Sequence, residues 1–163
     1  MPAPPNDGAR APAPDIVLRP AHDDDAAAIA HCVEAAYRHY IPRIGKPPGP
    51  MQDDYAEVVR RHRVFIAEMS GAPAGVLVLM RTPRGILLDN IAVHPEHQRR
   101  GIGRRLLALA ESETRALGYS QLELYTHERM AENIAFYRRA GYAETARRRE
   151  RGYERVYMRK ALR

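Results

Sequence analysis

The sequence has little cysteine and no long hydrophobic run. Its single cysteine, Cys32, excludes an internal disulfide and favours a reducing compartment, so we expect a cytoplasmic protein. No apolar stretch approaches the roughly 20 residues of a membrane-spanning helix, and we expect no membrane partner. The start of the chain lacks the basic residues and apolar block of a secretory signal. Cys32 stands in an apolar stretch at helical spacing, where we expect core packing and not a nucleophile.

The chain divides into a short leader of biased composition and one folding unit. Residues 1–14 are rich in proline and alanine and are predicted to be disordered. The whole chain has 163 residues, a length that fits one domain with a core of its own. We therefore predict a single domain over residues 15–163.

The net charge of +6 is concentrated in the second half of the chain. Residues 1–93 hold 10 Lys or Arg against 11 Asp or Glu, whereas residues 94–163 hold 16 against 9. A basic half suggests a polyanionic partner, which is either nucleic acid or a phosphate-rich cofactor. Aromatic and basic residues alternate only around Tyr153 and Tyr157, and no known nucleic-acid-binding motif is present. We therefore do not expect nucleic acid to be the partner.

Periodicity and turn residues predict the element order β-α-α-β-β-β-α-β-α-β-β. Pro42 is predicted to end the first helix, and the proline-rich residues 41–50 to form a rigid loop. The order indicates an α/β domain in which helices flank a mixed, mostly antiparallel sheet. The predicted strands span residues 16–19, 64–68, 75–81, 86–93, 122–126, 143–149 and 153–159, and the helices start near residue 23 or span about 52–62, 102–117 and 131–140.

A loop of anion-binding type lies between the strand 86–93 and the helix that follows. It reads Gln98-Arg99-Arg100-Gly101-Ile102-Gly103, with Arg104 next. Successive backbone N–H groups at a helix start converge on one point, and the helix dipole favours an anion there. Glycine lets the backbone approach a ligand closely, and the arginines add charge-assisted donors.

Two other phosphate-binding loops fit this segment poorly. A Walker loop needs Gly-Lys-Ser/Thr, but Gly103 is followed by Arg104 and Arg105. A dinucleotide-binding fingerprint needs a third glycine, and Leu106 stands at that position.

At this loop the chain resembles the GCN5-related N-acetyltransferases (GNAT). Their motif Gln/Arg-x-x-Gly-x-Gly/Ala matches Gln98 to Gly103, between a strand and a helix. A second match is Ala135-Phe136-Tyr137-Arg138-Arg139-Ala140-Gly141-Tyr142, which is similar to the late helix of the family. The resemblance covers about residues 15 to 162. It implies the acyl-CoA N-acyltransferase fold, acetyl-CoA as cosubstrate, and acetyl transfer to a primary amine by direct attack on the thioester.

The resemblance also implies roles for particular residues. The strand positions Ile91, Ala92 and Val93 would pair with the pantetheine arm and face the thioester carbonyl. The loop from Gln98 to Arg104 would bind the pyrophosphate. Tyr137 matches the usual general acid, which a phenol with a pKa near 10 can be at neutral pH. The family often has Asn where this chain has Met130, and Asn133, one turn before Tyr137, is the candidate to replace it at the cofactor.

The general base is open between Asp89, His127, Tyr125 and water. Asp89 is an acid in an otherwise apolar strand, and strand alternation puts it on the same face as Ile91 and Val93. It is either the base or a structural group held by a hydrogen bond. His127 titrates near neutrality but is equally explained as a surface histidine at a strand end.

The acceptor is expected to be a small-molecule or peptide amine. By resemblance, the loop 41–50 lines its site, where Arg43 or Lys46 would meet an acidic acceptor. Two other functions remain as alternatives, a catalytically silent acetyl-CoA-binding regulator and a basic nucleic-acid-binding protein. No metal site is predicted, and whether the chain forms a homodimer is open.

Overall fold

A computed structural model describes residues 15–163, so the predicted disordered leader, residues 1–14, lies outside the described residues. The domain is built on one seven-stranded sheet with the order β1-β2-β3-β4-β5-β7-β6. Neighbouring strands are antiparallel except β4 and β5, which are parallel. The predicted α/β class and the mixed, mostly antiparallel sheet are confirmed.

The elements follow the predicted order with one addition, a short helix after the first. The strands are β1 (Ile16–Pro20), β2 (Arg63–Met69), β3 (Ala72–Thr82), β4 (Gly85–Val93), β5 (Gln121–His127), β6 (Ala143–Glu150) and β7 (Tyr153–Ala161). The α-helices are α1 (Ala26–Tyr37), α2 (Ile41–Ile44), α3 (Tyr55–Arg61), α4 (Ile102–Ala116) and α5 (Ala131–Arg139). Single 3₁₀ turns occupy Asp23–Asp25, Arg38–Tyr40, Gly49–Gln52 and Pro95–His97.

The prediction that residues 41–50 form a loop was partly wrong. Ile41–Ile44 forms the helix α2, and Pro42 lies in its first turn. Backbone N–H groups in the first turn have no partner within the helix, so the N–H group that proline lacks costs no helical hydrogen bond. Gly45 ends α2 with φ of 88°. The next helix, α3, begins only at Tyr55, because the side chain of Asp54 caps it by accepting from the N–H groups of Ala56 and Glu57.

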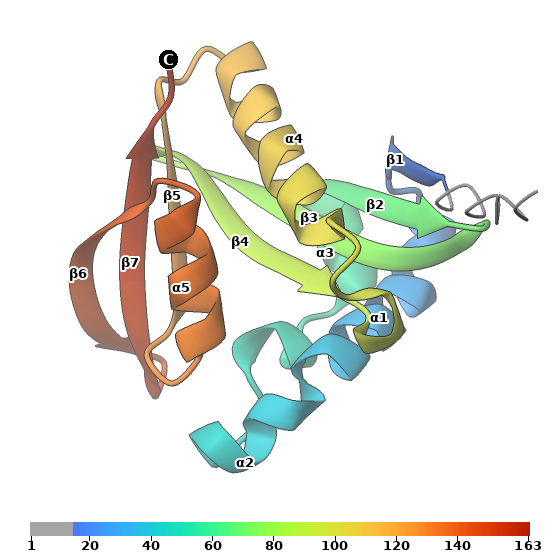
Figure 1. Ribbon diagram of the computed structural model, residues 1–163, viewed down its shortest axis with the longest axis horizontal. Coiled ribbons are helices and arrows are strands. Elements are labelled where there is room, and N and C mark those ends of the chain that lie inside the picture. The colour runs from blue at the N-terminus through green and yellow to red at the C-terminus, as the bar shows by residue number, and fades with distance from the viewer. Residues whose placement is uncertain (1–14) are drawn as a thin grey trace, which may run out of the picture.

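Helices cover both faces of the sheet and create two separate hydrophobic cores (Figure 1). On one face, α4 and α5 bury Ile102, Leu106 and Ile134 against β3, β4, β5 and β7. On the other, α1 and α3 pack against β2, β3 and β4. Cys32 lies in this second core, 1% exposed, and burial raises the pKa of its thiol to about 11. The predicted core role of Cys32 is confirmed.

A β-bulge in β4 changes which face its residues occupy. Val78 of β3 lies opposite Asn90, and the next residue, Leu79, lies opposite Leu88, so Asp89 has no partner in the register. An extra residue in one strand shifts the alternation by one position. Ile91 and Val93 therefore pack against the α4 core, whereas Asp89 bonds Tyr125 and lines a pocket with residues of the α1 side. The prediction that Asp89 shares a face with Ile91 and Val93 was wrong.

The strands β4 and β5 part in the middle of the sheet. They pair only from Ile86–Leu122 to Leu88–Leu124. Beyond this point β4 continues beside β3 and β5 continues beside β7. The sheet therefore opens into a wedge at its parallel pair, and within residues 15–163 no strand pairs with this edge of β4. In the part of the chain that is described, no helix has the length and apolar character needed to span a membrane.

Candidate functional site

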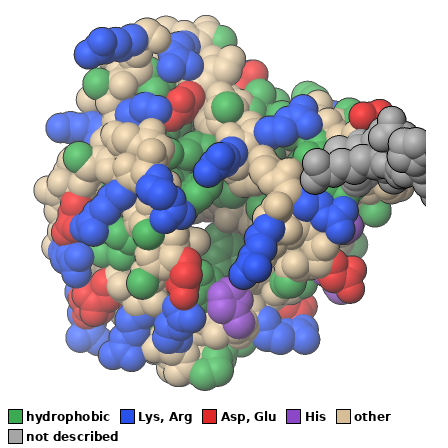
Figure 2. Space-filling model, in the orientation of Figure 1, with side chains coloured by type: hydrophobic (Ala, Val, Ile, Leu, Met, Phe, Trp, Pro, Cys, Tyr) green, Lys and Arg blue, Asp and Glu red, His purple; other side chains and the backbone are tan. Residues whose placement is uncertain are grey.

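A cleft of about 910 Å³ opens along the unpaired end of β4. Figure 2 shows a hollow near the middle of this face, bordered by Lys and Arg side chains. The predicted cofactor-binding residues that line the cleft are Ile91, Ala92, Val93, Gln98, Arg99, Gly101, Ile102, Gly103, Arg104, Asn133 and Tyr137. Arg100 does not line it, because its Nη1 lies 3.4 Å from Sδ of Met69 on β2.

The start of α4 forms one end of the cleft. Arg99 and Gly101 have positive φ, 64° and 80°, and Gly101 is the N-cap. The Arg105 N–H donates to the Gly101 carbonyl at 3.1 Å, so the earlier N–H groups of the helix precede its first internal hydrogen bond. Unpaired donors at the positive end of a helix dipole suit a phosphate group. The residues present therefore fit a pyrophosphate-bearing ligand.

The unpaired edge of β4 forms the floor of the cleft. The carbonyl of Ile91 accepts from the Tyr37 hydroxyl at 3.0 Å, and that of Val93 accepts from Nε2 of Gln98 at 3.2 Å. Both carbonyls thus point away from β3. Since the N–H and C=O of one strand residue point to the same side, the N–H groups of Ile91 and Val93 also face the cleft. By the same alternation, those of Ala92 face β3.

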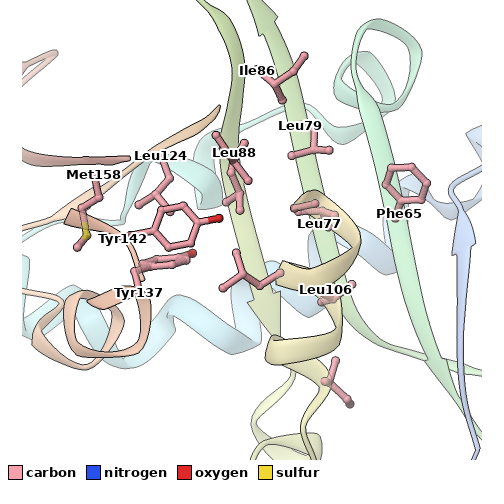
Figure 3. Close-up of a cluster of buried hydrophobic side chains, with 14 of the residues drawn as sticks. Phe65, Leu77, Leu79, Ile86, Leu88, Leu106, Leu124, Tyr137, Tyr142 and Met158 are labelled. Carbon is pink, nitrogen blue, oxygen red and sulfur yellow. The ribbon is translucent and has the colours of Figure 1, made fainter. Parts of the chain in front are cut away.

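Tyr137 reaches into the cleft from α5. Its side chain is buried, and its ring lies beside that of Tyr142, with the centroids 5.9 Å apart (Figure 3). The ring centroid of Phe136 lies 5.2 Å away. Burial raises the pKa of the Tyr137 hydroxyl, so the group is protonated at neutral pH. None of the hydrogen bonds formed within residues 15–163 involves this hydroxyl. Other buried tyrosines do have partners: Tyr37, Tyr40, Tyr55, Tyr142 and Tyr157.

Asn133 lies one helical turn before Tyr137 and lines the same cleft. Its Nδ2 is 3.5 Å from Sδ of Met130, the buried N-cap residue of α5. Met130 instead borders the pocket on the other side of β4. Glu132 of the same turn also lines the cleft but pairs with Arg43, so Asn133 is the uncharged polar side chain of this turn that a ligand in the cleft can reach.

A second, smaller pocket of about 60 Å³ lies on the α1 side of β4. We call it the acceptor pocket, after the role that we propose for it below. Its lining includes Asp89 of β4, Tyr125 and His127 of β5, Arg155 of β7, and the loop at 48–50. Tyr37 lines both this pocket and the cleft, so the two spaces meet at one side chain.

The titratable groups of the acceptor pocket are perturbed by burial. Burial raises the pKa of the Asp89 carboxyl, opposed by the hydrogen bond from Tyr125 and by the positive charge of His62 and Arg155. The Tyr125 hydroxyl donates to Oδ1 of Asp89 at 2.7 Å. Burial lowers the pKa of His127, whose Nδ1 accepts from the Arg129 N–H at 3.1 Å. Asp89 and His127 thus both border the acceptor pocket with pKa values that burial has shifted.

A buried hydrogen-bond network supports the two spaces, and the sequence did not predict it. The Tyr37 hydroxyl lies 2.6 Å from Oδ1 of Asn90. Nδ2 of Asn90 donates to the Tyr55 hydroxyl at 3.3 Å, which donates to the Pro50 carbonyl at 2.7 Å. Asn90 is 2% exposed. Its side-chain amide joins Tyr37 of α1 and Tyr55 of α3 to β4, next to the bulge. A polar residue in an apolar strand was the available signal, but nothing local identifies its partners.

Fold and site together define an acyl-CoA N-acyltransferase: a sheet that opens at a parallel strand pair, with an anion-binding helix start beside the opening. The sequence model described as an acetyltransferase (GNAT) domain matches residues 60–144, just over half of the chain. The chain therefore belongs to the GCN5-related N-acetyltransferase family.

Individual relatives agree with this assignment. The uncharacterized N-acetyltransferase YvbK of Bacillus subtilis (strain 168) is 29% identical over 94 residues, which span 57% of this chain and 61% of YvbK. The PaiA N-acetyltransferase of Thermoplasma acidophilum, solved with coenzyme A, superposes with a TM-score of 0.76 at 17% identity, covering 91% of this chain and 99% of that one. The ribosomal-protein-S18-alanine N-acetyltransferase of Escherichia coli superposes with a TM-score of 0.74 at 23% identity, covering 91% of this chain and 94% of that one. At these identities the two structures show the shared fold.

Proposed function

We propose that the protein transfers the acetyl group of acetyl-CoA to a primary amine by direct attack of the amine on the thioester. The observation that carries this proposal is the Tyr137 hydroxyl, which opens to the cleft from a buried side chain, is protonated, and has no partner among residues 15–163. A hydroxyl that opens to the cleft and makes no structural hydrogen bond suits a proton donor to a ligand.

The fit of acetyl-CoA rests on the two ends of the cleft. The open N–H groups at the start of α4, with Arg99 and Arg104 beside them, would hold the pyrophosphate. The unpaired edge of β4 would pair with the pantetheine arm as a neighbouring strand does, with the N–H groups of Ile91 and Val93 as donors.

The proposed transfer needs one proton removed and one proton supplied. The amine nitrogen loses a proton to the Asp89 carboxylate, directly or through water, and forms the new C–N bond as the C–S bond breaks. The departing thiolate takes a proton from the Tyr137 hydroxyl. The raised pKa of Asp89 makes its carboxylate a stronger base than an exposed one. His127 is the second candidate base, because it borders the same pocket.

The two alternatives have less support. A silent acetyl-CoA-binding regulator would not need a free hydroxyl at Tyr137. For nucleic acid, the arginines of β6 are not free donors, since Arg147, Arg148 and Arg149 each lie within 4.0 Å of a carboxylate.

Thiol release from acetyl-CoA, measured with a panel of amines, tests the proposal. Cys32 is buried and will not contribute to a thiol readout. We expect release that depends on both acetyl-CoA and an amine, with N-acetylated product identified by mass spectrometry. Tight acetyl-CoA binding without release for any amine would favour the regulator, and retention on DNA or RNA without acetyl-CoA binding would favour the nucleic-acid alternative.

A further inference from the structure

A set of contacts joins two segments that line the acceptor pocket. Nζ of Lys46 donates to the Gly152 carbonyl at 2.6 Å and lies 4.0 Å from the centroid of the Tyr153 ring. The Tyr153 hydroxyl donates to the Pro47 carbonyl at 2.6 Å. These contacts join the loop after α2 to the turn between β6 and β7, and we call them the latch. From them we infer that the acceptor is a small primary amine with an apolar body and no carboxylate, and not an amine of a polypeptide; this rests on the proposed function.

Both sides of the latch are held firmly. Arg151 and Gly152 have φ of 52° and 81°, so the strands Ala143–Glu150 and Tyr153–Ala161 are joined by a tight two-residue turn whose residues both have positive φ. On the other side, Pro50 is anchored by the Tyr55 hydroxyl at 2.7 Å, and Tyr55 lies in the second core. The latch therefore joins two fixed walls.

The room inside the pocket suits a small molecule. A volume of about 60 Å³ corresponds to about four to six water-sized groups. That is enough for a short alkyl or small cyclic amine. A polypeptide acceptor would also have to lay its backbone between loop 45–50 and the hairpin turn, where the latch contacts now lie.

The charges around the pocket select against an acidic acceptor. Asp89 is the carboxylate that faces the pocket and would attract an ammonium group. The cations nearby already contact protein groups: Arg43 pairs with Glu132 at 2.8 Å, and Lys46 donates to the Gly152 carbonyl in the latch. Arg155 pairs with Glu150 at 2.9 Å and lies over the Tyr125 ring. We expected Arg43 or Lys46 to meet an acidic acceptor. Both side chains are instead bound to groups of the protein itself.

Apart from Thr126 and His127, the remaining pocket walls are apolar or aromatic. Ile44, Met130 and the prolines at 48 and 50 form one part of the lining, and the rings of Tyr37, Tyr125 and Tyr153 form another. Aromatic rings bind ammonium groups by cation–π attraction and apolar chains by burial. This lining favours a hydrocarbon body behind the amine.

Three acceptors that share one amine test the inference. The first is n-pentylamine. The second is 5-aminopentanoate, in which a carboxylate replaces the terminal methyl group. The third is a blocked glycine-lysine-glycine peptide, which carries the same aminoalkyl chain on a peptide backbone. We expect kcat/KM for n-pentylamine to exceed the other two by at least about tenfold, or about 1.4 kcal/mol. Equal or better use of the peptide or the amino acid overturns the acceptor inference alone. No thiol release with any amine overturns the proposed function instead.

Latch variants provide a second readout. Lys46→Ala combined with Tyr153→Phe should raise the kcat/KM of the peptide relative to n-pentylamine by about tenfold. The matched control is Arg149→Ala, which removes a cation from the same hairpin and should leave the ratio unchanged. Among the described residues, Arg149 forms its ion pair with Glu154. The double variant should melt within a few degrees of the wild type. If it does so and its ratio is unchanged, the latch does not exclude polypeptides. If the double variant does not fold, the wild-type comparison still decides.

Discussion

The Tyr125 hydroxyl donates a 2.7 Å hydrogen bond to the Asp89 carboxylate at the point where their two strands part. The last paired residues, Leu88 and Leu124, immediately precede these two. The side-chain bond thus replaces the backbone ladder at the head of the wedge. It also holds a partly buried carboxylate at the acceptor pocket, which links the shape of the sheet to the proposed base.

Replacing Asp89 tests that role directly. Asp89→Asn keeps an oxygen that can accept from Tyr125 but removes the basic group. If Asp89 is the base, kcat at neutral pH should fall by about a hundredfold. The KM for acetyl-CoA should change little, because Asp89 does not line the cleft. A variant with nearly normal kcat would leave His127 or water as the base.

The same variant should be more stable than the wild type at neutral pH. Burial raises the pKa of Asp89 in the folded chain, so the ionised carboxylate costs stability above that pKa, and the cost disappears below the unfolded value. Each unit of pKa shift corresponds to about 1.4 kcal/mol. Urea unfolding of both proteins should show a difference that is largest above the raised pKa and vanishes at acid pH. A less stable Asp89→Asn protein would contradict this.

Tyr125→Phe should move the acid limb of the pH profile. The Tyr125 hydrogen bond lowers the pKa of Asp89, so its loss raises that pKa further, and kcat/KM should begin to rise only at higher pH. His62 and Arg155 also lower the pKa of Asp89. Asp53, whose own pKa is raised to about 6, titrates nearby as well. Profiles of both proteins with the same amine check the shift. An unmoved acid limb would mean that Asp89 does not set it.

Tyr137→Phe separates proton donation from packing. The phenyl ring retains the contacts with Phe136 and Tyr142, and no hydrogen bond within residues 15–163 is lost. If Tyr137 is the general acid, kcat should fall by about a hundredfold, while acetyl-CoA affinity, measured by calorimetry, stays nearly intact. Unchanged turnover would remove Tyr137 from the mechanism.

Local signals in the sequence predicted much of the fold. The helical spacing of Ile102, Leu106 and Ala110 predicted α4, and all three are buried. Gly118, with φ of 89°, follows the end of that helix as expected. The hairpin around Gly152 also forms. These features depend on residues close in the chain, where periodicity and glycine placement carry the information.

The parts that failed depend on distant partners. Alternation alone placed Asp89 on the wrong face, because the bulge is set by the register between β3 and β4. The bond between Asp89 and Tyr125, and the contact between Lys46 and Gly152, join residues far apart in the sequence. No local pattern encodes such pairs, so the sequence could indicate the cleft and several residues of the acceptor pocket but not the contacts among them.

Asn90→Ala should destabilise the fold. The Asn90 amide is buried and bonds Tyr37 and Tyr55, and its loss leaves part of the hydrogen-bonding capacity of both hydroxyls unfilled. Removing one partner from a buried pair costs about 1–3 kcal/mol. Urea unfolding should show this loss, and Asn133→Ala, on the cleft side of α5, is a matched control expected to lose less. Equal stability of Asn90→Ala and the wild type would mean that the network contributes no net stability.

The arginines of the loop should differ sharply in their contribution to acetyl-CoA binding. Arg104 lines the cleft beside the start of α4, whereas the guanidinium of Arg100 lies against Met69. A charge-assisted hydrogen bond contributes about 1.5–3 kcal/mol, so Arg104→Ala should weaken acetyl-CoA binding by about tenfold or more. Arg100→Ala removes the same charge from the same loop and should leave the dissociation constant within about twofold of the wild type. Titration calorimetry at two salt concentrations checks both, because a lost phosphate contact also reduces the salt dependence. Equal weakening in the two variants would mean that the loop attracts the cofactor through its net charge, and that the direction of each side chain is irrelevant.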